Sequence, residues 1–427
     1  MTPSETNPHS SKNTKPQRPE LVVPAGDLER LRMAVHYGAD AVYAGYPGLN
    51  LRAYASGFTE EEFARGVDIA HAHGTKLFAA VNIFAHNHHI EKAASIFKNL
   101  AQLNVDGLII SDPGIYEIAR QMAPHIPAHL STQAGVTNWR SAYFWQQQGF
   151  KRIVPARELT LSEIKQIKEN TDVELEVFVH GAMCMAYSGR CLLSAYFTGR
   201  GANRGECTHP CRWSYALVEE ARPGDPLELV EEDGGSFILS SRDLNMIDHI
   251  PELVETGVDA LKIEGRMKGL HYVATVAKTY REALEHYFAS PQDFAPDSKW
   301  QEELSKVSHR PYHTGFYFGM PEQVDPNETR HYLQPCLLAG VVLDYDSDSG
   351  MALVEQRNKF VAGDNLEVLT PRGEPFTLHV SSLYDLDGNE VDAAPHPRQN
   401  LWLPVPRELK YLDLLRKYAS PSSQEKS

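Results

Sequence analysis

The sequence predicts an α/β protein: a (β/α) TIM-like barrel with a cysteine-rich insertion, followed by a small carboxyl-terminal antiparallel β-barrel domain. A turn containing Gly or Asp recurs where a helical stretch ends and an apolar strand begins, at residues 38–43, 104–110, 149–154 and 257–263. Parallel strands that are covered on both faces show such apolar runs. After residue 336, short runs alternate apolar and polar residues between turns, as antiparallel strands do.

Composition divides the chain into segments with different expected structures. The amino terminus is rich in Ser, Thr, Asn, Lys and Pro, and Pro, Asp and Ser also accumulate after the last barrel helix. Such stretches favour disorder or linkers. The expected segments are a disordered amino terminus (1–18), the barrel (19–289) with its cysteine-cluster loop (181–236), a linker and connecting segment (290–335), the β domain (336–408) and a tail (409–427).

The sequence contains more strand candidates than a standard barrel has strands. After the first strand, Asp27 is a helix cap and Leu28 to Tyr37 has helical spacing. A standard barrel has eight strands, so one of about nine candidates is expected to belong to an insertion. The candidates are 21–23, 76–81, 128–130, 173–179 and 237–239, together with the strands that start within the four recurrent turns.

Polar side chains follow many of these strands. Active sites of such barrels lie just beyond the carboxyl ends of the strands. The residues at these positions are Tyr43, Asn82, Ser111, Asp112, Ser131, Thr132, Gln133, Arg157, Glu158, His180, Glu264 and Arg266.

Four of the five cysteines lie close together in a glycine-rich stretch, at Cys184, Cys191, Cys207 and Cys211. A cytosolic location is expected because the amino terminus has no apolar signal region, and this disfavours disulfides. Structural zinc prefers paired short spacings, whereas an iron–sulfur cluster needs four thiolates from an irregular loop. The pattern therefore favours an iron–sulfur cluster, with zinc and unliganded thiols as alternatives. Cys336, in an apolar context, is expected in the core.

The charge balance limits how the chain meets nucleic acid. The formal net charge is −15, which argues against a protein coated in nucleic acid. A local basic patch nevertheless surrounds the cysteines, and it either meets RNA or neutralises a cluster. No apolar run approaches the ~20 residues of a membrane helix, so no membrane contact is expected. The patch comprises Arg190, Arg200, Arg204, His209 and Arg212.

Several motifs resemble the collagenase-like peptidase family of unknown catalytic type, peptidase family U32. The signature residues are Glu176, Phe178, Gly181–Cys184, Gly189, Cys191, Leu193 and Ser194, and further matches lie at 24–27, 262–268, 308–312 and 314–319. The resemblance covers nearly the whole chain and is greatest to members that hydroxylate the wobble uridine of tRNA. It implies 5-hydroxyuridine synthesis, prephenate as cosubstrate, a 4Fe-4S cluster, and tRNA and the iron–sulfur assembly machinery as partners.

Roles for individual residues follow as hypotheses. The four cysteines are the predicted metal ligands, and His180, Glu176 and Glu264 are the catalytic candidates, with Asp243 as a possible carboxylate partner of Glu264. Dicarboxylate binding would use the guanidinium groups of Arg157, Arg242 and Arg266, which otherwise pair with nearby carboxylates. Tyr187 and Arg200 are expected to contact the RNA.

Three other functions remain open at this stage. One is a peptidase in which Cys184 and His180 form a nucleophile–base pair, although the zinc and serine-hydrolase motifs are absent from the sequence. Another is a hydroxylase of ribosomal RNA or of a quinone precursor. The third is a non-catalytic RNA-binding or scaffolding protein with a structural cluster.

Overall fold

The computed structural model describes residues 17–49, 57–184, 186–187, 191–200, 202, 207–212, 242–321 and 333–418. The amino terminus up to residue 16, the strand candidate 237–239, and Arg190 and Arg204 of the predicted basic patch lie outside these residues. No helix within the described ranges is long and apolar enough to cross a membrane.

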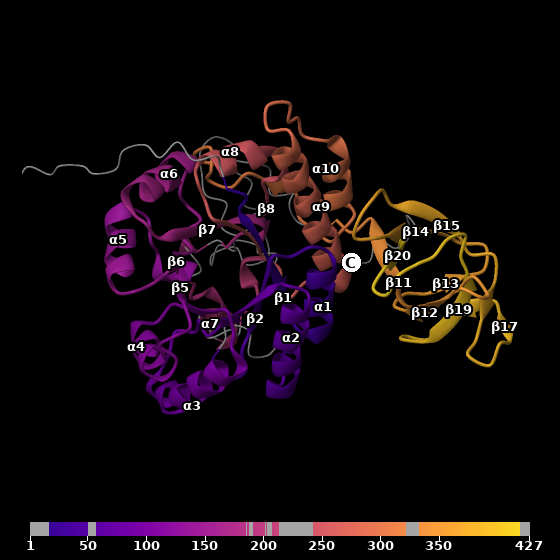
Figure 1. Cartoon of the computed structure of the whole chain (residues 1–427), viewed down its shortest axis with the longest axis horizontal. Coiled ribbons are helices and arrows are strands. Elements are labelled where there is room, and N and C mark those ends of the chain that lie inside the picture. Colours follow the sequence, from indigo (N-terminus) through magenta and orange to yellow (C-terminus); the bar gives the residue numbers. More distant parts are fainter. Residues whose placement is uncertain are drawn as a thin grey trace, which may run out of the picture.

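Eight parallel strands close into a barrel, which confirms the predicted fold class (Figure 1). Each strand from β1 to β7 pairs with the next, and β9 pairs with both β7 and β1. Leu261 of β9 is therefore in register with Leu21 on one side and Val177 on the other. The strands are β1 (Glu20–Ala25), β2 (Ala41–Gly45), β3 (Lys76–Ala80), β4 (Gly107–Ile110), β5 (Ala128–Leu130), β6 (Arg152–Ile153), β7 (Glu174–Ala182) and β9 (Ala260–Ile263).

Helices surround this barrel on its outer side (Figure 1). Several begin at a side-chain cap: the Asp27 carboxylate accepts from the amide of Arg30, and Thr59 and Thr160 form capping boxes. The first helix agrees with the expected Leu28 to Tyr37 within one residue. The helices are α1 (Leu28–His36), α2 (Glu60–Ala72), α3 (Asn87–Leu103), α4 (Pro113–Met122), α5 (Trp139–Gln147), α6 (Leu161–Asn170), α8 (Ile250–Glu255) and α9 (Leu270–Ala289).

Two short strands extend the sheet beyond the closed barrel. Strand β8 (Asp243–Asn245) runs antiparallel to the end of β7, and β10 (Tyr312–His313) runs parallel to β8. Helix α10 (Ser298–Ser305) precedes β10 and buries Trp300 and Leu304 in the main core. The segment expected as a linker, 290–335, thus contributes a helix and a strand to the barrel domain, because its apolar residues recur at helical spacing among polar ones.

The carboxyl-terminal domain is built from antiparallel strands, as predicted. Its main sheet has the order β15-β14-β20-β11-β12-β19-β16-β17, and β13 pairs with β18. The sheet reaches beyond the expected boundary at residue 408, because β20 lies between β14 and β11. The strands are β11 (Cys336–Asp346), β12 (Met351–Gln356), β13 (Phe360–Val361), β14 (Asn365–Leu369), β15 (Phe376–His379), β16 (Leu383–Tyr384), β17 (Glu390–Val391), β18 (Ala393–Ala394), β19 (Asn400–Pro404) and β20 (Leu414–Tyr418).

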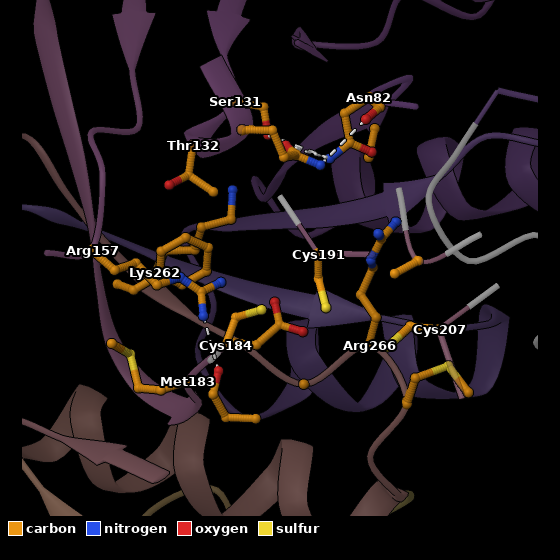
Figure 2. A pocket seen from close by; sticks show the side chains of 18 of the residues that line it. Asn82, Ser131, Thr132, Arg157, Met183, Cys184, Cys191, Cys207, Lys262 and Arg266 are labelled. Carbon is orange, nitrogen blue, oxygen red and sulfur yellow. Dashed lines mark hydrogen bonds between the residues drawn. The ribbon is translucent and has the colours of Figure 1, made fainter. Parts of the chain in front are cut away.

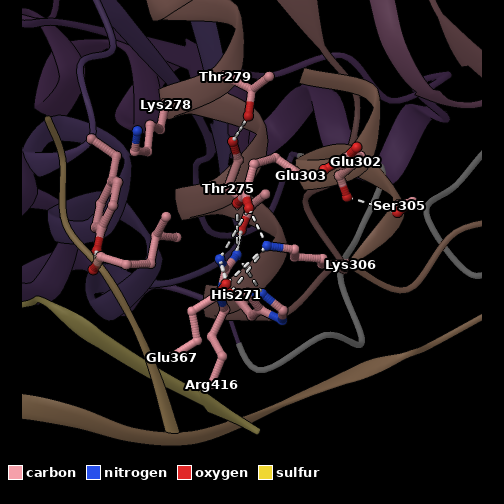
Figure 3. A network of polar contacts seen from close by, with 12 residues as sticks. His271, Thr275, Lys278, Thr279, Glu302, Glu303, Ser305, Lys306, Glu367 and Arg416 are labelled. Atoms are coloured by element: carbon pink, nitrogen blue, oxygen red, sulfur yellow. Dashed lines mark hydrogen bonds and ion pairs between the residues drawn. The ribbon is translucent and has the colours of Figure 1, made fainter. Parts of the chain in front are cut away.

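A buried ionic network joins the two domains (Figure 3). The side chain of Arg416, from β20, is fully buried. Its guanidinium donates to Glu303 of α10 at 2.9 Å and to Glu367 of β14 at 2.5 Å. Lys306 pairs with the same two carboxylates. Because both domains supply charges that satisfy one another, this network fixes how the β domain sits against α9 and α10.

Candidate active site

A cavity of about 470 Å³ lies at the carboxyl ends of the barrel strands, where the fold class predicts the active site (Figure 2). Its wall includes Tyr43 of β2 and residues that directly follow β3, β5, β6, β7 and β9. Of the twelve residues expected at strand ends, the cavity wall contains Tyr43, Asn82, Ser131, Thr132, Gln133, Arg157, Glu264 and Arg266.

All four clustered cysteines line this cavity. Cys184 follows β7, Cys191 precedes the short helix α7 (Leu193–Thr198), Cys207 follows α7, and Cys211 lies in η4 (Pro210–Arg212). None is in a disulfide. Figure 2 shows the thiols of Cys184 and Cys191 directed into the cavity. The sequence therefore folds so that thiols from four places along the insertion face one space.

The thiols affect one another electrostatically. Desolvation against the cavity wall raises the pKa of the Cys184 thiol, and negative charge on Cys191 or Cys207 raises it further, whereas Arg157 lowers it. Thiolates that face the same cavity thus need a positive partner. A metal centre would be such a partner, because cysteine binds metals as the thiolate.

Four thiols around one cavity are the donor set that an iron–sulfur cluster requires, so the residue types fit this group. The described residues hold no group of three or more His, Cys, Asp or Glu side chains converged closely enough to ligate a metal ion. The thiols would have to approach one another when a cluster binds. The cluster, like its ligand set, stays a prediction.

One side of the cavity is cationic. The guanidinium of Arg157 stacks over the Phe178 ring at 3.8 Å and donates to the Ala182 carbonyl at 2.9 Å. The ammonium of Lys262 lies 4.3 Å from the centroid of the Tyr43 ring. Arg266 and Lys268 also line the cavity, and Figure 2 shows Arg266 across it from Arg157. Sequence reasoning omitted Lys262 from the site, although a lysine within an otherwise apolar strand was a signal that it has an ionic partner.

That partner is Glu176, which is fully buried beneath the cavity and is not part of its wall. It pairs with Lys262 at 2.5 Å and with Arg152 at 3.1 Å. Burial would raise the pKa of Glu176, but the two cations outweigh this effect and hold the pKa at about 2. Glu176 is therefore an ionised group that positions Lys262, and its predicted catalytic role stays a prediction.

His180 does not line the cavity. The pairing of β7 with β9 shifts register between Phe178 and His180, and this bulge breaks the alternation that would give both side chains the same face. The imidazole is buried among the rings of Tyr272, Tyr280 and Tyr312. Burial lowers the pKa of His180 to about 3, so the ring is neutral at physiological pH.

The third catalytic candidate, Glu264, does line the cavity and accepts a hydrogen bond from the Tyr43 hydroxyl at 3.1 Å. Gly181 packs directly against the backbone of Glu264. It has φ +105°, and an added Cβ would lie 2.3 Å from the Glu264 carbonyl oxygen. The bend at the end of β7 and the position of Glu264 are thus coupled. Asp243 is buried near Arg310 and lies outside the cavity wall.

The remaining predicted binding residues lie away from the cavity wall. Arg242 is half-buried beside His313, and its positive charge lowers the pKa of that imidazole in addition to the larger effect of burial. Tyr187, 55% exposed, lies on the chain between Cys184 and Cys191, and Arg200 is exposed after α7. The structure therefore places both Arg157 and Arg266 in the cavity wall and leaves Arg242 outside it.

Fold and site together define a (β/α) barrel protein whose cavity gathers four thiols and a cationic wall at the carboxyl ends of the strands. Two family models match the chain in succession: peptidase family U32 over residues 26–326, and the peptidase family U32 C-terminal domain over residues 334–416. The chain belongs to peptidase family U32.

Three relatives match most of this chain. tRNA hydroxylation protein P1 of Bacillus subtilis (strain 168) is 43% identical over 402 residues, which is 94% of this chain and 95% of the relative. tRNA hydroxylation protein P of Escherichia coli (strain K12) is 37% identical over 451 residues, with coverage of 95% and 98%. The 23S rRNA 5-hydroxycytidine C2501 synthase of Escherichia coli (strain K12) is 37% identical over 300 residues, with coverage of 70% and 44%.

Proposed function

We propose that this protein is a tRNA-modifying enzyme that hydroxylates C5 of the wobble uridine to give 5-hydroxyuridine. The observation that carries the proposal is the similarity, over nearly the full length of both chains, to relatives named for tRNA hydroxylation. A relative named for a cytidine product in ribosomal RNA matches 70% of this chain, which supports RNA hydroxylation as the general activity. The fold alone therefore does not determine whether uridine or cytidine is the substrate.

The proposed cofactor is an iron–sulfur cluster held by Cys184, Cys191, Cys207 and Cys211. Such a cluster, when bound, supplies electron transfer or a Lewis-acid site to the reaction. The chain's own contribution is to hold thiolates in a partly desolvated space and to offset their charge with Arg157, which lowers the pKa of Cys184. The cationic wall matters for this reason as well as for substrate binding.

The proposed cosubstrate, prephenate, is a dicarboxylate, and the cationic wall is suited to a carboxylate. Arg157 is held flat against Phe178, so its guanidinium is pre-oriented and loses little freedom on binding an anion. Lys262 is already neutralised by Glu176, so Arg157 is the main anion-binding group of this side. Carboxylate binding on this side would leave the opposite, uncharged side for the base.

Exposed aromatic rings near the cysteines support binding of an unpaired RNA base. Helix α7 lies between Cys191 and Cys207 and presents Tyr196, which is 82% exposed, with Phe197 packed edge-on against it. Bases splayed out of a loop are recognised by stacking on such rings. Tyr187 and Arg200 would extend this surface, consistent with a base from an anticodon loop approaching the cavity beside the thiols.

The peptidase alternative has no support in the site geometry. Cys184 lines the cavity, whereas His180 is enclosed among tyrosines behind the bulge in β7. A nucleophile and its base must lie within hydrogen-bond reach of each other. The different surroundings of these two side chains do not favour such a pair.

The proposal is tested first by metal content and then by nucleoside analysis. Iron and acid-labile sulfide per chain, with the visible spectrum, would be measured on anaerobically purified wild type, Cys191→Ala and Cys336→Ala. We expect iron and sulfide in the wild type and in Cys336→Ala, whose cysteine lies in β11 outside the cavity, and their loss in Cys191→Ala. Zinc in the wild type, or equal iron in both variants, would refute the cluster.

Mass spectrometry of tRNA nucleosides would then compare a deletion strain with strains that carry each variant. We expect 5-hydroxyuridine to disappear on deletion, to return with the wild type and with Cys336→Ala, and to stay absent with Cys191→Ala. Unchanged 5-hydroxyuridine in the deletion strain would refute the tRNA-modifying function.

A further inference from the structure

The wall of the cavity opposite the cysteines is polar but uncharged. Figure 2 shows Asn82, Ser131 and Thr132 together on one side of the cavity, with Cys184 and Cys191 on the other. Asn82 follows β3, and the other two, with Gln133, follow β5. All four side chains are at least nine-tenths buried, so their polar atoms are satisfied by one another or by a ligand in the cavity.

Hydrogen bonds to the main chain fix the orientation of the Gln133 amide. Its Nε2 group donates to the backbone carbonyl of Asn82 at 3.3 Å, which only the nitrogen end of the amide can do. The carbonyl end, Oε1, therefore faces Ser131, whose hydroxyl donates to it. Ser111 anchors the same Asn82 carbonyl with a second hydrogen bond at 3.0 Å.

The Asn82 amide is oriented in turn by Gln133. Because Gln133 presents an acceptor, Asn82 must turn its nitrogen toward it, and Nδ2 lies 3.4 Å from both Gln133 Oε1 and Ser131 Oγ. The oxygen, Oδ1, then faces away. This oxygen is buried and has no hydrogen-bond partner among the described residues, and Asn82 as a whole is only 8% exposed. A buried acceptor in a cavity wall indicates a ligand that brings a donor.

We propose that the Asn82 amide recognises the Watson–Crick edge of a uracil base. This inference rests on the proposed RNA function and names the side chain that selects the base. Uracil carries an N3–H donor flanked by carbonyl acceptors, so N3–H donates to Oδ1 while a neighbouring carbonyl accepts from Nδ2. Cytosine has an acceptor at N3 and an amino donor at C4, so its N3 lone pair would face Oδ1. The fixed orientation of the amide therefore favours uracil over cytosine.

Charge separates this site from the one for the anionic cosubstrate. A carboxylate next to Oδ1 would bring two acceptors together, whereas Arg157 and Arg266 attract it to the cationic wall. A neutral base edge suits the uncharged wall. Thr132 fits the same scheme, because its hydroxyl donates to the Pro155 carbonyl at 2.9 Å and so places no competing donor toward the base.

The inference is tested by binding. The anaerobically purified full chain would be titrated with two synthetic anticodon stem–loop RNAs that differ only in having uridine or cytidine at the wobble position. For the wild type we expect the uridine RNA to bind about tenfold more tightly, the size of discrimination that one well-placed pair of hydrogen bonds provides. Equal affinities would overturn the inference.

Asn82→Asp removes the donor of the amide while keeping its shape, and we expect the affinity ratio to fall to about one. Gln133→Met removes the acceptor that orients the Asn82 amide, and we expect the ratio to fall as well, in a second variant with a different local change. The matched control is Asn138→Asp, which adds the same charge at the cap of α5, where Asp serves equally well. Its ratio should equal that of the wild type.

The ratio distinguishes recognition from stability, because partial unfolding lowers both affinities equally. A wild-type preference that persists in both cavity variants would overturn the inference. Failure of the inference is also distinct from failure of the proposed function. If deletion abolishes 5-hydroxyuridine but the wild type binds both RNAs equally, only the role of Asn82 is lost. If deletion leaves 5-hydroxyuridine unchanged, both are lost.

Discussion

Replacing Arg416 by methionine tests the link between the two domains. Methionine keeps much of the apolar stem, so the change removes mainly the charge and the hydrogen bonds to Glu303 and Glu367. Removing one partner of a buried ion pair costs about 3–5 kcal/mol. Here both carboxylates keep Lys306 as a partner and are 15% and 20% exposed, which places the expected loss near the lower limit, about 3 kcal/mol.

The pH dependence of this loss follows from Glu303. Burial would raise the pKa of its carboxyl, but Arg416 and Lys306 hold the pKa below the ordinary value of 4.5. A carboxyl whose pKa is lowered in the folded state stabilises the fold above its unfolded pKa and loses this effect as the pH falls through the folded value. The cost of Arg416→Met should therefore be largest at neutral pH and shrink in acid.

The assay is urea unfolding, with the free energy of unfolding of wild type and variant compared at about pH 7 and about pH 4. Lys299→Met is the matched control, because Lys299 also bridges the domains, to Glu374, but on the exposed surface. We expect no measurable loss from it. A loss below about 1 kcal/mol for Arg416→Met at neutral pH, or one that does not shrink in acid, would contradict this account of the interface.

Two further changes probe positions where backbone or hydroxyl geometry is decisive. Gly181→Ala should lower the free energy of unfolding by more than about 2 kcal/mol, because the new Cβ meets the Glu264 carbonyl at a positive φ. The control is Gly199→Ala, which is also at a positive φ but has open space around it and should cost about 1 kcal/mol. Equal losses in the two variants would refute the steric argument. Tyr37→Phe removes a buried interdomain hydrogen bond to the Leu369 carbonyl at 2.8 Å and should cost about 1 kcal/mol in urea unfolding, whereas an unchanged midpoint would show that this bond contributes nothing.

The barrel was predictable from the sequence because its signals are local. Most βα units carry their own turn, apolar strand and helix within a few tens of residues, and a series of such units leaves few ways to close a sheet. The gathering of the cysteines was predictable for a similar reason, since the four thiols lie close together along the chain. Their common cavity follows from the end of β7 pointing into the mouth of the barrel.

Features that depend on distant partners were not predictable. His180 turns away from the cavity because of a bulge in the pairing of β7 with β9, and no pattern within β7 reveals it. The ion pairs of Glu176 could not be predicted because its partners, Arg152 and Lys262, are on other strands. The expected end of the β domain at residue 408 leaves out β20, whose buried Arg416 is neutralised by Glu303 and Glu367 on distant parts of the chain.

The ladder between β7 and β8 has a consequence for the cysteine insertion. Gly181 pairs with Leu244 and Ala182 with Asp243, so the chain leaves the barrel and returns to it at adjacent points. The cost of closing a loop depends only weakly on its length once its ends are joined. The insertion can therefore lengthen, shorten or change its contents without altering the register of the barrel strands. Losing whatever the thiols bind would then affect the insertion alone, and the barrel would survive as an intact scaffold that can be loaded again.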